Sequence, residues 1–129
     1  MDLTILIPTR IETEDRLRNI ISSVSYLLKN VPAKIMVKEV SDQNTFKFRA
    51  LPEIKKYADT VHLTHLYEES NDPLFCKSKV LNDMIVAADT NVVANYDADC
   101  ILPIEAYRQA YNAIQDNQLD VVYPYQCGI

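Results

Sequence analysis

Residues 91–99 read NVVANYDAD, an apolar run that ends in two aspartates separated by one alanine. The run predicts a buried strand over residues 91–96, because β-branched and apolar side chains favour strands. Residues i and i+2 of an extended chain point to the same side. The carboxylates of Asp97 and Asp99 can therefore face one hard divalent cation, Mg²⁺ or Mn²⁺. The pair is a weak signal by itself and gains weight from its place directly after a strand.

The rest of the chain alternates between strand and helix patterns. Residues 3–7 are a continuous apolar run that Pro8 ends, and residues 13–30 carry apolar side chains at helical spacing after a plausible N-cap, Thr13. Leu6 and Val93 are predicted to be core residues of central strands. The predicted strands are 3–7, 34–40, 60–66, 91–96 and 119–123, the predicted helices are 13–30, 53–58, 74–88 and one that begins at Pro103, and residues 43–52 are predicted to form a loop.

This alternation predicts the fold class: an α/β, three-layer sandwich with a mostly parallel sheet and right-handed crossovers. The 129 residues suffice for a single domain, 1–129. In such sheets ligands bind at the carboxyl ends of the strands. Polar side chains stand at several of these ends, among them Thr9 and Arg10 after the first strand and Glu39 and Asp42 at the second. The alternative for Glu39 and Asp42 is that they are solvated loop acids, and the alternative for Thr9 and Arg10 is that they are polar residues at the start of a helix.

The composition and charge of the chain exclude several classes of function. The net charge of −5 argues against nucleic acid as a partner. Residues 1–64 hold ten Lys and Arg against eight Asp and Glu, whereas residues 65–129 hold three against ten. A single glycine, Gly128, excludes the glycine-rich dinucleotide and Walker motifs. From the lack of a long apolar run and of a basic N-terminal region we expect neither a transmembrane segment nor a signal peptide. The three cysteines have no metal-ligand spacing, so we expect reduced thiols and a cytoplasmic location.

Taken together and in order, several stretches resemble the nucleotide-sugar half of family 2 glycosyltransferases, which have the GT-A, Rossmann-like fold. These stretches are LTILIPTR, EDRLRN, KIMVKEVSD and CKSKVLNDMIVAADTNVVANYDADCILP. The phrases TEDRLRNIISSVSYLLK, VLNDMIVAADTNVVANYDAD and DVVYPY are closest to the galactosyltransferase and chondroitin-polymerase-like branch. The resemblance covers nearly the whole chain.

The resemblance implies a role for particular residues. Pro8, Thr9 and Arg10 would line the base site, and Glu39 would contact the uracil or the ribose with Asp42 beside it. Asp97 would hold the ribose or a metal-bound water, and Asp99 would bind Mn²⁺ or Mg²⁺, which bridges the diphosphate. The nucleotide-binding residues implied in this way are Pro8, Thr9, Arg10, Glu39, Asp42, Lys79, Asn82 and Asp97, and the implied metal ligands are Asp97 and Asp99. Lys77 lies on the same predicted helix as Lys79 and Asn82.

The resemblance also implies an activity. The enzyme would transfer a hexose or N-acetylhexosamine from a UDP-sugar to a saccharide acceptor, with inversion. Members of the family usually have a longer catalytic domain, whose second half supplies the catalytic base, so this chain is expected to be an N-terminal fragment. The full-length protein could associate with a membrane surface. Two alternatives stay open: a non-catalytic nucleotide- or metal-binding module of similar fold, and, more weakly, a Mg²⁺-dependent phosphotransfer enzyme.

Overall fold

A single parallel sheet forms the centre of the molecule. The computed structural model describes residues 1–98, 100–116 and 120–122. The strands are β1 (Leu3–Thr9), β2 (Lys34–Ser41), β3 (Leu63–Glu69) and β4 (Val92–Asn95). They lie in the order β3-β2-β1-β4, and each neighbouring pair is parallel. The predicted parallel sheet is thereby confirmed for the described part of the chain.

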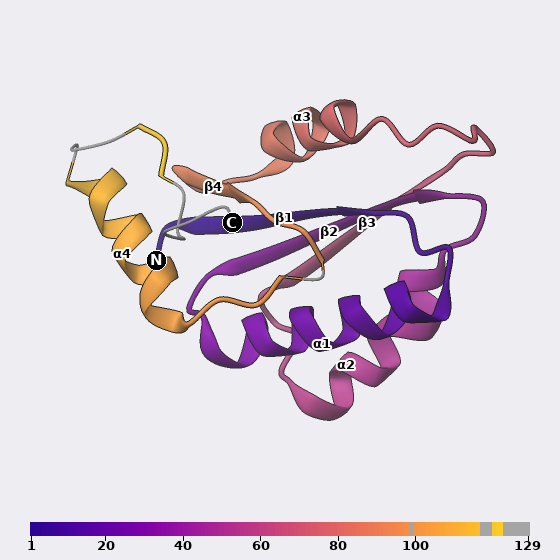
Figure 1. The fold of residues 1–129 in the computed structure, drawn as a ribbon, viewed down its shortest axis with the longest axis horizontal. Coiled ribbons are helices and arrows are strands. Elements are labelled where there is room, and N and C mark those ends of the chain that lie inside the picture. The colour runs from indigo at the N-terminus through magenta and orange to yellow at the C-terminus, as the bar shows by residue number, and fades with distance from the viewer. Residues whose placement is uncertain (99, 117–119, 123–129) are drawn as a thin grey trace.

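Helices cover both faces of this sheet (Figure 1). The helices α1 (Glu14–Asn30) and α2 (Leu51–Tyr57) lie on one face, and α3 (Lys77–Ala87) lies on the other. The last helix, α4 (Ile104–Gln115), lies beside the amino-terminal end of β1, where the backbone N–H of Asp2 donates to the Tyr111 hydroxyl at 2.9 Å. The three layers agree with the predicted sandwich. Within the described residues, no helix has the length and apolar content that crossing a bilayer requires.

The core follows from the alternation of side chains along β1. Ile5 and Ile7 pack with residues of α1 such as Ile20, whereas Leu6 faces the opposite layer and packs with Met84 of α3. Leu6 is completely buried, as predicted. Val93 is only partly buried, because β4 pairs with β1 alone and forms an edge of the described sheet.

The first strand continues past its predicted end. Pro8 was expected to stop the strand, but β1 reaches Thr9, and Pro8 is in register with Lys38 of β2. Proline lacks the N–H that a central strand needs for its ladder. On the other side of β1 the ladder with β4 ends at the pair Leu6 and Asn95. Pro8 is therefore tolerated because it lies beyond the stretch of β1 that has neighbours on both sides.

The predicted loop over residues 43–52 is wrong, because most of it is helical. A π-helix, η1 (Phe46–Ala50), leads directly into α2. Phe46, Ala50 and Ile54 are at most 1% exposed and recur every four residues, so one side of this segment faces the core. Pro52 falls in the first turn of α2, where no α-helical N–H bond is required.

One further predicted strand begins later than expected, and another lies partly outside the described residues. The predicted strand at 60–66 becomes β3, which begins later because Asp59 and Thr60 form a turn: the Asp59 Oδ1 atom accepts from the Val61 N–H at 2.9 Å, and the Thr60 carbonyl accepts from the Leu63 N–H at 3.0 Å. The ends of the predicted strand at 119–123 lie outside the described residues, and residues 120–122 are not in a strand.

The helix predictions agree more closely with the structure. Thr13 is the N-cap of α1, and its side chain accepts from the Arg16 N–H. Pro103 is the N-cap of α4, as the sequence predicted for the start of that helix. The helix predicted at 74–88 becomes the shorter α3.

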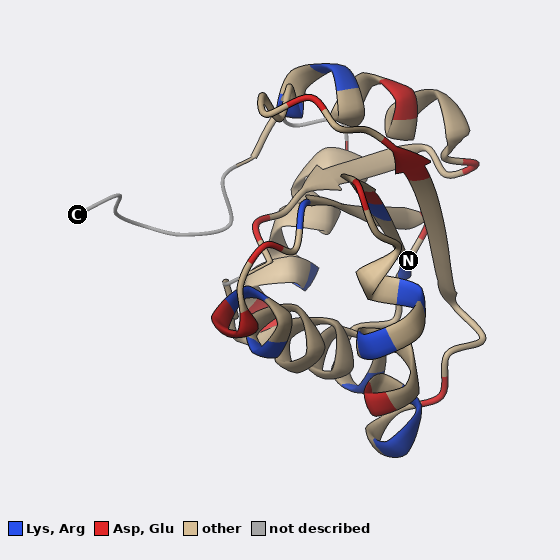
Figure 2. Cartoon of the chain, turned by 90° about the vertical axis from the view of Figure 1, so that its right-hand side faces the viewer, with Lys and Arg blue, Asp and Glu red and all other residues tan. Residues whose placement is uncertain are grey.

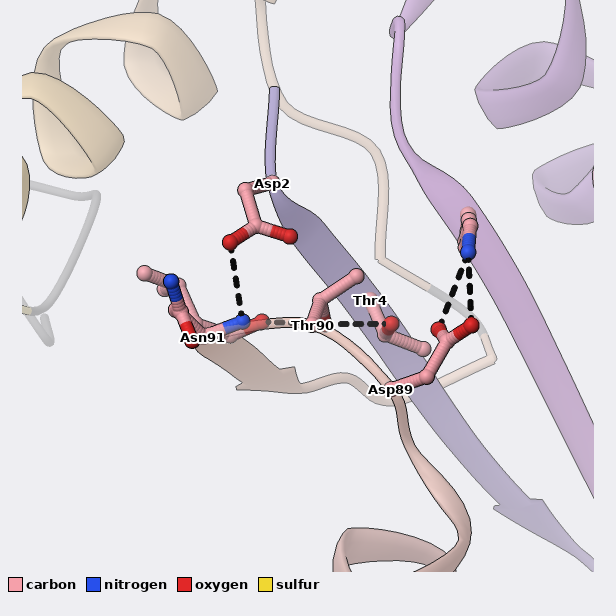
Figure 3. A network of polar contacts seen from close by, with 7 residues as sticks. Asp2, Thr4, Asp89, Thr90 and Asn91 are labelled. Atoms are coloured by element: carbon pink, nitrogen blue, oxygen red, sulfur yellow. Dashed lines mark hydrogen bonds and ion pairs between the residues drawn. The ribbon is translucent and has the colours of Figure 1, made fainter.

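Polar contacts fix the start of β4 at the amino end of the sheet (Figure 3). The Asn91 N–H donates to Asp2 Oδ2 at 3.1 Å, and the hydroxyls of Thr4 and Thr90 lie 2.6 Å apart. These contacts tie the segment before β4 to β1 and so help to set the register of the two strands. The carboxyl ends of the strands lie at the opposite end of the sheet.

Candidate functional site

The carboxyl ends of the strands meet at one edge of the sheet, on the right in Figure 1 and facing the viewer in Figure 2. The chain runs outward from β1 to β2 and β3, and then places β4 on the other side of β1. In open parallel sheets ligands bind where the strand order reverses in this way. Two pockets open at this edge, and segments of both charges surround it in Figure 2.

The larger pocket has a volume of about 440 Å³ and lies over the ends of β1, β2 and β3. Its acidic lining residues are Glu12, Asp42 and Asp72. Arg10 is the one basic residue among the described residues that line it. Hydroxyl, amide and backbone groups from segments such as 41–45 and 70–73 complete the lining. This pocket therefore offers mainly hydrogen-bond acceptors to a ligand.

The smaller pocket has a volume of about 370 Å³ and lies between the ends of β1 and β4. Its charged lining residues are Arg10, Arg16, Lys77 and Asp97, so basic side chains outnumber acidic ones. Pro8 and Thr9, predicted to line a base site, line this pocket. The two pockets thus differ in charge, and they share one side chain, Arg10.

Arg10 is a buried cation between the pockets, with 9% of its surface exposed. Its Nε donates to the Val40 carbonyl and one terminal nitrogen donates to the Asp72 carbonyl, both at 2.7 Å. The guanidinium carbon lies 5.5 Å from the centroid of the Phe75 ring, a cation–π contact. The other terminal nitrogen is buried with no hydrogen-bond partner in the described structure. Arg10 is therefore held rigidly with donor capacity to spare.

An ion pair connects α3 with the loop after β4. Lys77 Nζ lies 2.5 Å from Asp97 Oδ1, and both side chains are about half exposed or more. Lys79 and Asn82, which the sequence favoured, are exposed on α3 and line neither pocket. Lys77 is the first residue of α3, at the end of the helix that meets the strand ends. The sequence feature that could have pointed to Lys77 is its position at the start of the helix. The sequence predicted that this helix begins at residue 74, three residues too early.

Glu39 is completely buried and lines neither pocket. Its Oε1 accepts from the backbone N–H of Phe46 at 2.8 Å, and its Oε2 is buried with no hydrogen-bond partner in the described structure. The structure brings Asp42 to the larger pocket and places Glu39 behind it. Across the sheet from Glu39, the Tyr67 hydroxyl donates to the Ser41 carbonyl at 2.9 Å.

Carboxylates also surround Tyr67, which does not line the larger pocket but bonds to Ser41 at its wall. Burial raises the pKa of Tyr67, and the carboxylates of Glu69, Glu39 and Asp42 raise it further. The hydroxyl of Tyr67 therefore stays protonated around neutral pH, where it can only donate or accept a hydrogen bond. The three carboxylates that line the larger pocket favour a neutral ligand with N–H and O–H donors over an anion.

Hydroxyl groups hold the segment after β4 in place. The Ser23 hydroxyl donates to the Ala98 carbonyl at 2.5 Å, and the Tyr26 hydroxyl donates to the Leu102 carbonyl at 2.9 Å. The hydroxyls of Tyr96 and Tyr107 lie 2.9 Å apart, and burial raises the pKa of both. The loop that carries Asp97 is therefore anchored to α1 and α4.

A metal site is predicted at Asp97 and Asp99. Asp97 lines the smaller pocket, and its carboxylate oxygens are the donors that Mg²⁺ and Mn²⁺ prefer. Asp99 lies outside the described residues. Among the residues that the structure describes, no three His, Cys, Asp or Glu side chains are grouped as a metal site would require. The donor chemistry of Asp97 fits such an ion, and the pairing with Asp99 stays a prediction.

Comparison with known proteins adds to this geometry. No family model and no curated protein matches the sequence. Among solved structures, the fold is similar to that of a protein from Desulfovibrio desulfuricans G20, provisionally named a nucleotide-diphospho-sugar transferase. The TM-score is 0.51, the sequence identity is 18%, and the match covers 88% of this chain and 55% of that one. This chain thus spans about half the length of that protein and, over this span, has a similar fold.

Proposed function

We propose that this chain is the nucleotide-sugar-binding part of a metal-assisted glycosyltransferase. The observation that carries the proposal is a pair of adjoining pockets of opposite charge that share Arg10, at the edge of the sheet where the strand order reverses. The substrate we propose is a UDP-sugar, whose hexose or N-acetylhexosamine is transferred to a saccharide acceptor with inversion. The branch of family 2 enzymes that the sequence resembles favours this substrate class.

The charges of the pockets favour one orientation of the nucleotide. The acidic pocket suits a uracil and a ribose, because carboxylates accept hydrogen bonds from ribose hydroxyls and from base N–H groups. The basic pocket suits the diphosphate, because Arg16 and Lys77 can neutralise its charge. Arg10 would contact the nucleotide where its two halves join.

The proposed roles follow this orientation. Asp42 and Arg10 bind the nucleoside, and Pro8 and Thr9, which line the smaller pocket, contact the nucleotide beside Arg10. Lys79 and Asn82 stay candidates only if α3 shifts toward the nucleotide, whereas Lys77 already lines the basic pocket. Asp97 and Asp99 would hold Mn²⁺ or Mg²⁺. When bound, this ion would act as a Lewis acid that stabilises the negative charge of the departing diphosphate.

The complete enzyme would need groups beyond those assigned so far. Direct displacement requires a carboxylate that takes the proton of the acceptor hydroxyl, and such a base is typically worth about 10²–10⁴ in rate. We assign this base and the acceptor groove to the part of the protein that corresponds to the remainder of the longer structural neighbour. We propose a cytoplasmic location, with peripheral contact to a membrane through the full-length protein.

A non-catalytic nucleotide-binding module is the second candidate. The same two pockets favour it, since they could bind a nucleotide without any acceptor groove. Both candidates require the same nucleotide site. They differ in whether the protein transfers sugar to an oligosaccharide.

Calorimetric titration tests the shared site. Uridine, UDP, ADP and a panel of UDP-sugars are titrated in Mn²⁺ and again in EDTA. We expect UDP to bind more tightly than ADP, and more tightly in Mn²⁺ than in EDTA. Equal UDP affinity in the two conditions would remove the metal from the proposal. Failure of both uridine and UDP to bind would overturn the nucleotide site itself.

A further inference from the structure

Glu39 is placed to shape the larger pocket without lining it. The carboxylate is fully buried, and one of its oxygens holds the backbone N–H of Phe46, seven residues further along the chain. The Oε1 atom accepts from this N–H at 2.8 Å. The hydrogen bond places the two residues at a fixed separation. It joins the end of β2 to the first residue of η1.

The segment between these two anchors forms one wall of the larger pocket. Ser41, Asp42, Gln43 and Thr45 all line it. The segment also bonds to itself, since the Gln43 carbonyl accepts from the Ser41 hydroxyl at 2.6 Å and from the Thr45 N–H at 2.9 Å. These local bonds shape the turn, and Asn44 joins it to η1 by accepting from the Lys47 and Phe48 N–H groups at 3.4 and 3.3 Å. The contact with Glu39 is the shortest of the bonds to η1 and ties the segment back to β2.

We propose that Glu39 is a positioning residue, which fixes the wall at residues 41–45 through the Phe46 N–H and does not touch the nucleotide. This inference rests on the proposed function, because it assumes that the larger pocket takes the uridine part of the ligand. It assigns Glu39 a role different from the base or ribose contact that the sequence resemblance implies. For this role the side chain must be long enough to bring an acceptor oxygen to the Phe46 N–H, and its negative charge is not required.

Two substitutions at Glu39 distinguish the effect of side-chain length from the effect of negative charge. Glu39→Gln keeps the length of the side chain and a carbonyl oxygen that can accept from Phe46, but loses the charge. Glu39→Asp keeps the charge and shortens the side chain by one methylene, so the acceptor withdraws from Phe46. Glu68→Asp, at an exposed acidic position on β3, is the matched control.

The measurements are amide hydrogen exchange at Phe46 in the ligand-free protein and titration with uridine and with inorganic pyrophosphate. For Glu39→Asp we expect exchange at Phe46 to accelerate at least tenfold and uridine affinity to fall at least tenfold. For Glu39→Gln and for the control we expect both quantities to stay within about threefold of the parent. Pyrophosphate, which suits the smaller pocket, should bind all variants equally.

The contrary results are distinct. If Glu39→Asp keeps uridine affinity and Glu39→Gln loses it, Glu39 contacts the ligand through its charge, and the positioning role is overturned. Unchanged exchange at Phe46 in Glu39→Asp would overturn it as well, without any ligand. A parent protein that does not bind uridine would overturn the proposed function together with the positioning role in binding.

Discussion

Lys77 Nζ and Asp97 Oδ1 lie 2.5 Å apart and connect the start of α3 with the loop that follows β4. The two residues are 20 positions apart in sequence and line the same pocket. An ammonium group therefore stands beside the carboxylate that is predicted to bind a metal. A bound diphosphate and cation would give each of these side chains a new partner of opposite charge.

Replacement of Lys77 tests which lysine of α3 serves the nucleotide. We expect Lys77→Gln to weaken UDP binding about tenfold, because a charge-assisted contact to the diphosphate is lost. Lys79→Gln, on an exposed position of the same helix, should leave the affinity within about twofold. Titration calorimetry with UDP measures both. A larger loss for Lys79→Gln would favour the residue that the sequence alone suggested.

Replacement of the two aspartates tests the metal. Asp97→Asn and Asp99→Asn keep the size of the side chain and remove its charge, so we expect each to abolish most of the difference in UDP affinity between Mn²⁺ and EDTA. Asp89→Asn is a suitable control, because Asp89 pairs with Lys34 at the opposite end of the sheet. If both variants keep the full Mn²⁺ effect, the ion binds elsewhere.

Truncation of Leu6 tests the core. Leu6 is completely buried between β1 and α3, so we expect Leu6→Ala to lower the free energy of unfolding by about 2–5 kcal/mol. Val93→Ala should cost less, since Val93 is only partly buried. Val86→Ala, at a position 86% exposed, should change stability by less than about 0.5 kcal/mol. Urea denaturation gives all three values, and a similar loss for Leu6 and Val86 would contradict the packing.

His65 should make stability depend on pH. Burial lowers the pKa of His65 below its ordinary 6.5, and the charges of Lys47 and Lys55 lower it further. The unfolded chain therefore takes up the proton first, so this contribution to stability is present above about pH 6.5 and is lost as the pH falls toward the folded pKa. The ring lies 5.8 Å from that of Phe46, so protonation charges a group beside the core.

The measurement is the urea midpoint of the parent and of His65→Leu between about pH 8 and about pH 5. Subtracting the free energy of unfolding of the variant from that of the parent at each pH removes the slope that other groups cause in both proteins. We expect the parent to lose more stability than the variant as the pH falls below about 6.5. Parallel curves would show that His65 does not titrate differently in the folded state.

Local pattern predicted much of the fold. The apolar run at β1, the helical spacing of α1 with its N-cap Thr13, and the proline that opens α4 each depend on neighbours in sequence. The helical segment was missed because the apolar Phe48, which is exposed, obscures the four-residue spacing of the buried Phe46 and Ala50 until the core contacts are known. The end of β1 was missed because the effect of Pro8 depends on the length of β4.

The sequence by itself determined the alternation of strands and helices, and it placed Thr9, Arg10, Asp42 and Asp97 near strand ends, because hydrophobic period and chain order are local properties. It could not determine that β4 pairs with β1, since strand order depends on contacts between distant segments.

Only the tertiary structure decided which pocket each side chain lines and which residue it contacts. It placed Arg10 between two pockets, brought Lys77 to Asp97, and buried Glu39 against Phe46. The physical reason is that the direction, burial and partner of a side chain follow from the packing of elements far apart in sequence, which neither spacing nor composition records.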